Sequence, residues 1–302
     1  MRNLAFAVAL GFGLVACSSD DASPTNPSPN HAPSETDARS QTPPGSTAYG
    51  PRVTPGIAPG VTLRDAPRNF VTSRDGQLIE NLVFRSQPKI RHARVHFRNC
   101  KWVTTQGDNH WAFDPADFDD LRTAGVIFER NDFADALPAI YSADPAQPAK
   151  VIASIFRGTS DGYGDSAKVG SNLVIEDSVF QYDHPTLPYA HADGLQSDMG
   201  SVAHVTVRYS YFDVTTPGAN AALLQNEVGD EVGDWLIEHN HIHAQGAYPV
   251  RIYHLTGSGR ATVRENRIDR IWIYGPLDIT DHPELVDWTN NVDEKGAVIP
   301  RP

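Results

Sequence analysis

The sequence predicts an all-β fold built as a solenoid of short coils, and three observations support this prediction. A hexad of the form apolar, charged, any, small polar, any, apolar recurs along the chain. Most copies begin with alternating apolar and polar residues, which is the pattern of a strand. The last four copies begin at Ile175, Val207, Ile237 and Val263, and no stretch between them has the 3.6-residue period of an amphipathic helix. Repeats of this length made only of strands stack into a solenoid.

The first sixteen residues have the layout of an export signal. Arg2 precedes an apolar run over residues 4–16 that is too short to cross a bilayer as a helix. The run ends in Leu-Val-Ala-Cys, at residues 14–17, which resembles a bacterial lipobox. The resemblance implies cleavage after residue 16 and a lipid on the thiol of Cys17. An ordinary secretory signal with a chance cysteine is the alternative.

Residues 17–60 are rich in Pro, Ser, Thr and Gly and contain few large apolar side chains. This composition predicts a disordered tether between the lipidated Cys17 and the folded domain. The lipid would hold the protein at a membrane surface. We therefore expect a location in the cell envelope, facing outside the cytoplasm. Ser18 resembles an outer-membrane sorting signal, which would apply in a Gram-negative host.

The folded domain is expected over residues 61–302. The fourth hexad position is small and polar, and in a solenoid these residues stack about 4.8 Å apart as an inward ladder. The ladder positions are Cys100, Asn131, Ser178, Ser210, Asn240 and Asn266. The apolar residues expected to stack beside the ladder are Phe133, Phe180, Phe212, Ile242 and Ile268. This repeat resembles the right-handed parallel β-helix of pectate-lyase-like proteins.

Two parts of the domain depart from the repeat. Phe128 and Ile175 begin hexads but lie too far apart for one coil, so residues 134–174 hold either an extra coil or a long loop. The last residues, from Asp281, fade out of the repeat and are expected to form a cap. Cys100 fills a ladder position, and Cys17 is assigned to the lipid, so no internal disulfide is expected.

A second strand follows the bend in each coil, and these strands can be aligned by sequence. The segment HADGLQS, which begins at residue 191, aligns with the later segments NAALLQN, YPVRIYH and IYGPLDI. In this alignment one inward column contains Leu195, Leu224, Ile252 and Leu277. The neighbouring outward column contains Gln196, Gln225, Tyr253 and Asp278. Gly194 would leave room for a ligand on the sheet.

Polar residues on this face predict a site for a long, hydroxyl-rich polymer. The resemblance to pectate-lyase-like proteins also implies a polysaccharide. In β-elimination of a uronate polymer, Arg251 would neutralise the carboxylate and His191 would take the α proton, with its pKa tuned by Asp193. Tyr253 or His254 would protonate the leaving oxygen. Gln196, Gln225, Tyr253 and His254 are the predicted substrate-binding residues.

Two alternatives to a lyase remain open. A glycoside hydrolase needs two carboxyl groups, for which Asp193 with Asp213 or Asp278 are the candidates. Ala192-Asp193-Gly194 and Arg251-Ile252 resemble two polygalacturonase motifs, but the Asp-Asp and Gly-His-Gly motifs between them are missing. The paired-arginine motif of pectate lyases is also missing. A non-catalytic glycan-binding or adhesion protein is the second alternative.

The sequence contains few features that indicate a cofactor or a partner other than a glycan. His239, His241 and His243 look like a metal cluster, but the first two would flank buried Asn240 and face solvent, so no metal site is expected. Aspartates in the segment 158–170 could bind Ca²⁺, without the spacing of an EF-hand loop. The net charge of −12 and the lack of a basic run argue against nucleic acid. We expect a monomer.

Overall fold

A computed structural model describes residues 48–103, 124–158, 166–183, 192–197, 202–225, 233–252, 259–279 and 282–302 of the chain. These residues form three parallel sheets and a short 3-10 helix, η2 (Pro283–Leu285). No described helix has the length and hydrophobicity needed to cross a membrane. The predicted signal peptide, Cys17 and most of the predicted tether lie outside the described residues.

The sheets are numbered here in the order in which the chain enters them within one coil. Sheet 1 contains β2 (Leu78–Glu80), β4 (His96–Arg98), β6 (Ile127–Glu129), β9 (Ala149–Ile152), β12 (Leu173–Glu176), β15 (Ala203–Arg208), β18 (Gly233–Glu238), β21 (Ala261–Arg264) and β24 (Val286–Thr289). Sheet 2 contains β1 (Arg64–Asp65), β3 (Leu82–Phe84), β5 (Lys101–Val103), β7 (Asp132–Asp135), β10 (Ile155–Phe156), β13 (Val179–Phe180), β16 (Tyr211–Val214), β19 (His241–Ala244) and β22 (Arg267–Ile268). Sheet 3 contains β8 (Ala139–Ile140), β11 (Ala167–Val169), β14 (Ala192–Ser197), β17 (Ala219–Gln225), β20 (Val250–Ile252) and β23 (Leu277–Ile279).

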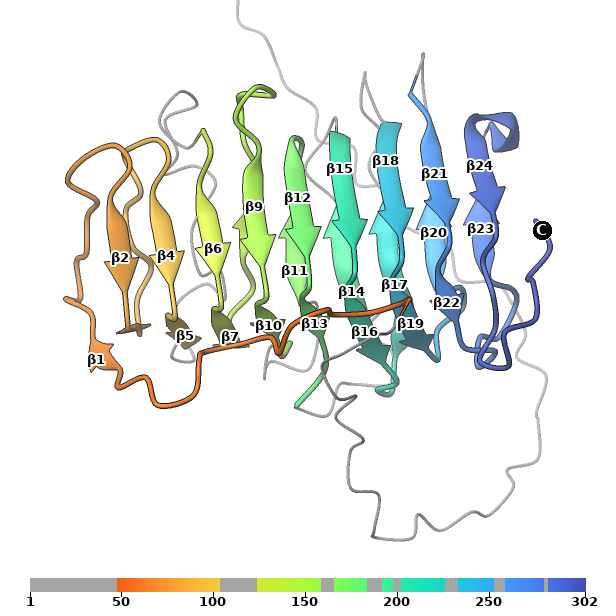
Figure 1. Cartoon of the computed structure of the whole chain (residues 1–302), viewed down its shortest axis with the longest axis horizontal. Helices are drawn as coiled ribbons and strands as arrows, with labels where there is room; N and C mark the ends of the chain where they lie inside the picture. The colour runs from red at the N-terminus through yellow and green to blue at the C-terminus, as the bar shows by residue number, and fades with distance from the viewer. Residues whose placement is uncertain are drawn as a thin grey trace, which may run out of the picture. The chain divides into compact units, whose positions relative to one another are not determined.

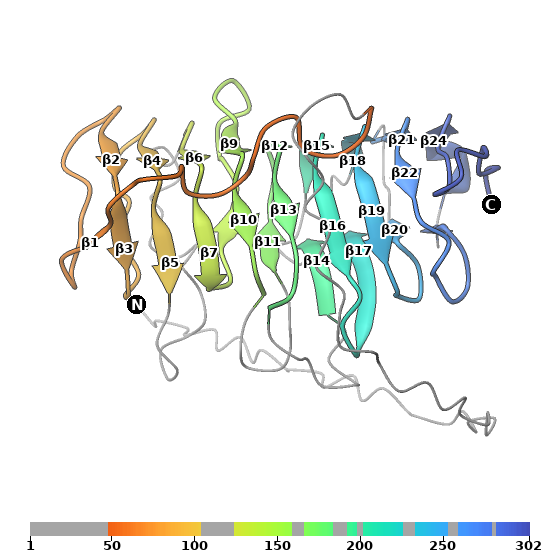
Figure 2. The same cartoon turned by 60° about the horizontal axis from the view of Figure 1, so that its bottom comes forward.

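Successive coils lie side by side along one axis, from β2 to β24 (Figure 1). Each strand pairs in parallel with the equivalent strand of the next coil, as β12 pairs with β15 over four residues. Turning the view shows sheets 2 and 3 on the side opposite sheet 1 (Figure 2). The prediction of an all-β, right-handed parallel β-helix is therefore confirmed.

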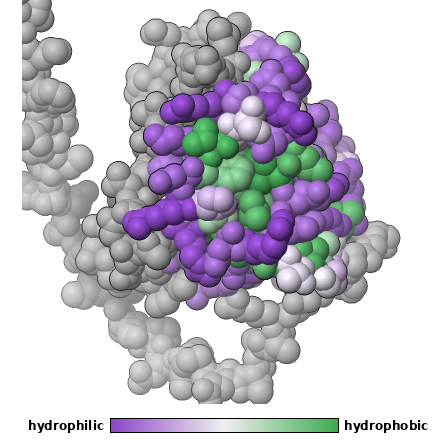
Figure 3. All heavy atoms as spheres, turned by 90° about the vertical axis from the view of Figure 1, so that its left-hand side faces the viewer, coloured by the Kyte–Doolittle hydropathy of each residue, from purple (hydrophilic) through white to green (hydrophobic). Residues whose placement is uncertain are grey.

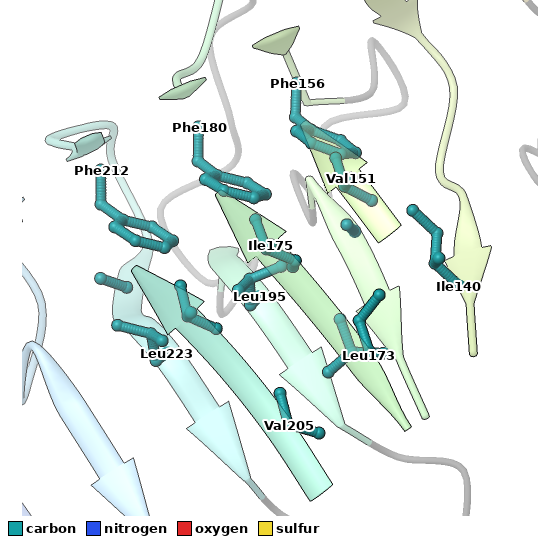
Figure 4. Packing of buried hydrophobic residues seen from close by; sticks show 14 of the residues in the cluster. Ile140, Val151, Phe156, Leu173, Ile175, Phe180, Leu195, Val205, Phe212 and Leu223 are labelled. Atoms are coloured by element: carbon teal, nitrogen blue, oxygen red, sulfur yellow. The ribbon is translucent and has the colours of Figure 1, made fainter. Parts of the chain in front are cut away.

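The core is a stack of aromatic rings that runs along the axis. The rings of Phe133, Phe156, Phe180 and Phe212 lie 4.5 to 4.6 Å apart between centroids and within 6° of parallel. Figure 4 shows three of these rings above the aliphatic side chains of the other two sheets. Ile242 and Ile268 are also fully buried, as the hexad predicts. The ring spacing follows the strand spacing because each ring comes from one coil.

The predicted polar ladder is also present beside this stack. Its residues are fully buried, and each backbone N–H donates to the side chain of the next coil. Asn240, for example, accepts from the Ser210 N–H at 2.9 Å, and its own N–H donates to Asn266 Oδ1 at 2.9 Å. The residue before each ladder position has a positive φ, such as 55° at His239, which makes the sharp bend from sheet 1 to sheet 2. Burial raises the pKa of the Cys100 thiol to about 11, which fits a structural role at its ladder position.

In the part that the structure describes, residues 134–174 form an extra coil and not a long loop. Strand β9 lies between β6 and β12, and Ser154 fills a ladder position between β9 and β10. The hexad of this coil is Val-Ile-Ala-Ser-Ile-Phe, whose second position is apolar instead of charged. At the other end, β24 and Asn291 add one more coil, so the repeat continues further into the C-terminal segment than predicted.

A strap formed by residues 48–60 runs along the bends between sheets 1 and 2. It is the orange segment that passes from beside β19 to β1 in Figure 1 and Figure 2. The Gly50 N–H donates to the carbonyl of His239 at 2.9 Å, and the Gly56 N–H donates to the carbonyl of Ala153 at 2.7 Å. The strap therefore connects coils that lie far apart along the axis.

Arg52 is the main side-chain contact of the strap. Its guanidinium donates to both carboxylate oxygens of Asp177, at 2.9 and 2.7 Å, and lies 3.8 Å from the centroid of the Tyr209 ring. The predicted boundary at residue 60 is therefore too late, because residues 48–60 pack against the solenoid.

Among the strands that the structure describes, none pairs with the outer side of β2 in the first coil. Figure 3 shows this end of the solenoid, where hydrophobic residues gather at the centre of the face within a hydrophilic rim. Val71 and Leu78 belong to this coil and have exposed side chains. The exposure is expected where a repeat ends, because each coil covers the core of the next.

Candidate functional site

The candidate site lies on sheet 3, where the structure corrects the register that the sequence alignment predicts. Leu195 pairs with Leu223 and not with Leu224, and Arg251 pairs with Leu224 and Asp278. The inward column is Ala167, Leu195, Leu223, Val250 and Leu277. The outward column contains Lys168, Gln196, Arg251 and Asp278, and the backbone of Leu224 pairs between Gln196 and Arg251. The predicted alignment was thus wrong by one residue in β17 and by two residues in β20, where Ile252 is nevertheless buried.

A β-bulge interrupts the pairing of β14 with β17. Ala192 pairs with Ala219, but Asp193 pairs with Ala221, so Asn220 is an extra residue in β17. A bulge bends the strand and redirects the extra side chain. The sequence alignment had placed Asn220 over His191 and counted no extra residue. The bulge puts an amide side chain on the edge of the candidate site.

Asp193 is fully buried and lies on the same side of its strand as Leu195. Its Oδ1 accepts hydrogen bonds from the Ala221 N–H at 2.9 Å and from Asn220 Nδ2 at 3.2 Å. A buried carboxylate is stable only when such donors replace water. In this structure Asp193 therefore positions its neighbours instead of facing a ligand.

The prediction that Gly194 clears space for a ligand is wrong. A Cβ at this position would lie 2.5 Å from the carbonyl oxygen of Ala222 and 3.0 Å from the ring of Phe212. The missing side chain allows two coils to pack closely, and Gly194 itself is buried.

Arg251 is the centre of the site. Val250 and Ile252 on either side are buried, so the guanidinium projects outward from β20. Its Nη1 donates to Asn220 Oδ1 at 2.5 Å, and its Nη2 lies 3.3 Å from Asp278 Oδ2. Asn220 thus connects the buried carboxylate of Asp193 to the guanidinium. Two fixed partners hold the plane of the guanidinium, which is the geometry needed to bind a planar carboxylate.

A second cation follows in the same column. Lys168 of β11 is 6% exposed, and its Nζ donates to Oε1 of Gln196 in the next coil. Lys168 and Arg251 are three strands apart, a distance of about 14 Å at about 4.8 Å per strand. Lys168, Asn220 and Tyr248 were missed in the sequence, although the alternation in Ala167-Lys168-Val169 could have indicated an outward lysine.

Several predicted site residues cannot be placed. His191, Tyr253 and His254 lie outside the described residues, as does the side chain of Gln225. Residues 159–165 of the loop considered for calcium also lie outside them. Among the predicted site residues, the structure brings Asp193 and Arg251 together through Asn220 and places Gln196 in the same outward column as Arg251.

A second polar cluster lies on sheet 2, around Asp269. One carboxylate oxygen of Asp269 is 3.0 Å from His241 Nε2 and 2.7 Å from His243 Nδ1. The other accepts from Arg267 Nε at 3.0 Å. Burial alone would raise the pKa of Asp269, but these donors outweigh it and hold the pKa far below its usual value. The hydrogen bond to Asp269 raises the pKa of His243.

The side chains of His239, His241 and His243 do not converge on one point. Asn240 is fully buried between His239 and His241, as predicted, and His239 instead pairs with Glu265 at 3.1 Å. Among the described residues, no group of three or more His, Cys, Asp or Glu side chains could hold a metal ion.

The carboxylates considered for hydrolysis are separated by the fold. Asp213 lies in β16 of sheet 2, whereas Asp278 lies in β23 of sheet 3 and pairs with Arg251. Asp193 is buried on the inner side of β14. The described part of sheet 3 therefore does not present two carboxyl groups across one bond.

Comparisons with protein-family models, with curated proteins and with solved structures return no match to this chain. The resemblance to pectate-lyase-like proteins thus depends on the repeat and motifs of the sequence.

Proposed function

We propose that this protein is a surface-tethered polysaccharide lyase that binds a uronate-containing glycan along sheet 3 and cleaves it by β-elimination. The observation that carries the proposal is the oriented guanidinium of Arg251 on the outward face, with Lys168 in the same column. Two cations on one face form a local basic cluster, which favours a ligand with repeated carboxylates on a protein whose net charge of −12 otherwise repels polyanions.

In the proposed reaction, Arg251 binds the substrate carboxylate and stabilises the negative charge that develops when the α proton leaves. His191 takes that proton, and the electron pair of the C–H bond forms a double bond between the α and β carbons. The bond from the β carbon to the linkage oxygen breaks, and Tyr253 or His254 gives this oxygen a proton. Asp193 and Asn220 act as positioning residues for Arg251.

Hydrolysis is less well supported, because it needs two carboxyl groups on opposite sides of the linkage. Asp193 is buried and Asp213 lies on another sheet. Glycan binding without cleavage is the second candidate. It is favoured by the exposed ring of Tyr274, which lies against Tyr248 beside Arg251.

The test is the ultraviolet absorbance of the unsaturated product while the protein is incubated with uronate polymers and with their carboxyl-reduced forms. We expect a rise only with the carboxylated polymers, and its loss in His191→Ala and Arg251→Ala. Arg94→Ala, which removes an exposed arginine several coils away from Arg251, is the matched control. If no product and no new reducing ends form but the polymer binds, the second candidate replaces the lyase.

The membrane attachment through Cys17 is part of the proposal. Metabolic labelling with a fatty acid should label the chain, and Cys17→Ser should abolish both the label and the membrane fraction. Labelling of Cys17→Ser equal to that of the unchanged chain would refute the anchor.

A further inference from the structure

Two consecutive large hydrophobic side chains are exposed in the turn before β23. Tyr274 is 73% exposed, the highest value among the large hydrophobic residues that the structure describes, and Ile273 is 65% exposed, as is Val298. Leaving an aromatic ring in water forgoes roughly 1.5 to 3 kcal/mol of burial, so adjacent exposed residues of this kind often mark a binding surface.

The ring of Tyr274 is part of a larger arrangement. Its centroid lies 5.7 Å from that of Tyr248, and the two rings are tilted by 42°. The guanidinium carbon of Arg251 lies 5.8 Å from the centroid of Tyr248. The two rings therefore continue the surface of the candidate site from Arg251 towards the C-terminal coil.

The backbone under the two rings is held in place. The Ile273 N–H donates to the carbonyl of Gly246 at 3.0 Å, and the Tyr274 N–H donates to that of Ala247 at 3.1 Å. The turn is thus hydrogen-bonded to the preceding coil, although it is not part of a strand. A surface held in this way loses little conformational entropy when a ligand binds.

We infer that Tyr248 and Tyr274 form an aromatic platform on which a pyranose ring of the glycan stacks, next to the sugar whose carboxylate Arg251 binds. This inference rests on the proposed function for the class of ligand. The face of an aromatic ring carries partial negative charge, and the axial C–H bonds of a pyranose carry partial positive charge, so the two faces attract. Stacking is insensitive to the carboxylate, whereas Arg251 recognises it.

This division of roles gives the test. The full chain, with His191→Ala to prevent cleavage, is titrated calorimetrically with short uronate oligosaccharides and with the same oligosaccharides reduced at the carboxyl group. Tyr274→Ala should weaken both by a similar factor, about fivefold for the loss of one ring contact. Tyr274→Phe should retain the affinity, and Val298→Ala, which removes a similarly exposed apolar side chain outside the platform, is the matched control. Arg251→Ala should weaken only the carboxylated ligand.

Each other outcome has a separate meaning. If the oligosaccharides bind but Tyr274→Ala leaves both affinities unchanged, the platform is refuted and the proposed function remains. If Tyr274→Ala weakens only the carboxylated ligand, the ring acts through Arg251 and not by stacking, which also refutes the inference. If neither oligosaccharide binds the chain, the platform and the proposed function are refuted together.

Discussion

Replacing Asn240 by alanine tests the role of the polar ladder in stability. Asn240 is fully buried, and its Nδ2 donates to the Val207 carbonyl at 2.9 Å, while its Oδ1 accepts from the Ser210 N–H at 2.9 Å. Alanine would leave both backbone groups without these partners in the core. Each such group costs about 1 to 3 kcal/mol, so we expect a loss of about 4 kcal/mol in the free energy of unfolding.

Serine at the same position is the matched control, because serine occupies this position in three other coils. A serine hydroxyl can accept from the Ser210 N–H, but it would reach the Val207 carbonyl only weakly, as Ser154 reaches the equivalent carbonyl of Phe128 at 3.4 Å, so Asn240→Ser should cost about half as much. Urea unfolding followed by circular dichroism measures both values, and hydrogen exchange reports the Ser210 N–H directly. A cost below about 1 kcal/mol for alanine, or equal costs for alanine and serine, would contradict the reasoning.

Three further predictions concern packing, the strap and pH. Gly194→Ala should lower stability by about 1 to 3 kcal/mol, because its Cβ would lie 2.5 Å from a backbone carbonyl oxygen, and a thermal melt measures the change. Arg52→Ala removes the partner of Asp177, which is 7% exposed, and should expose the strap to limited proteolysis. The pair of His243 and Asp269 should stabilise the fold most between about pH 4 and 6.5. The raised pKa of His243 gives stability that is lost as the pH rises through that pKa, and the lowered pKa of Asp269 gives stability that is lost as the pH falls through its own. Melts of the parent and His243→Asn across this range test the last prediction.

Matched variants identify results that would contradict these three predictions. Gly275→Ala places a Cβ at an ordinary 3.5 Å from its nearest neighbour, so an equal loss there would show that packing at Gly194 is not the cause. Arg94→Ala should leave the strap protected, because Arg94 pairs with an exposed carboxylate elsewhere. His204→Asn removes the exposed pair of His204 with Asp234. It should leave the pH dependence of stability unchanged, whereas His243→Asn should alter it.

The sequence predicts the parts of the fold that each coil repeats. Phe180 and Asn240 could be assigned to the stack and the ladder because their chemistry recurs at fixed positions in the hexad. The coil at residues 149–156 was not recognised because Ile152 stands where other copies have a charge. It became visible only through the pairing of β9 with its neighbours.

The candidate site was harder to predict because it depends on an irregularity. The sequence alignment placed β17 one residue out of register, which exchanges inward and outward positions in that strand, and it did not allow for Asn220 as an extra residue. The burial of Asp193 could have been predicted, since it is two residues from inward Leu195 on the same strand. Tyr248 and Tyr274 lie in turns, where no periodicity indicates the direction of a side chain.

The strap has a consequence for how the protein loses its structure. In a solenoid each coil contacts only its neighbours, so terminal coils can fray while the middle stays folded. Arg52 and Asp177 are 125 residues apart in sequence, and the strap also binds the bends at Ala153 and His239. These contacts can form only after the coils between them have stacked, although the strap is synthesised first. The strap also binds Arg130 and Asn99 at the bends of earlier coils. Once the strap is docked, any two of these coils can separate only if the contacts of the strap also break. We therefore expect the stack to unfold as one cooperative unit from Asn99 to His239, with fraying confined to the coils beyond it.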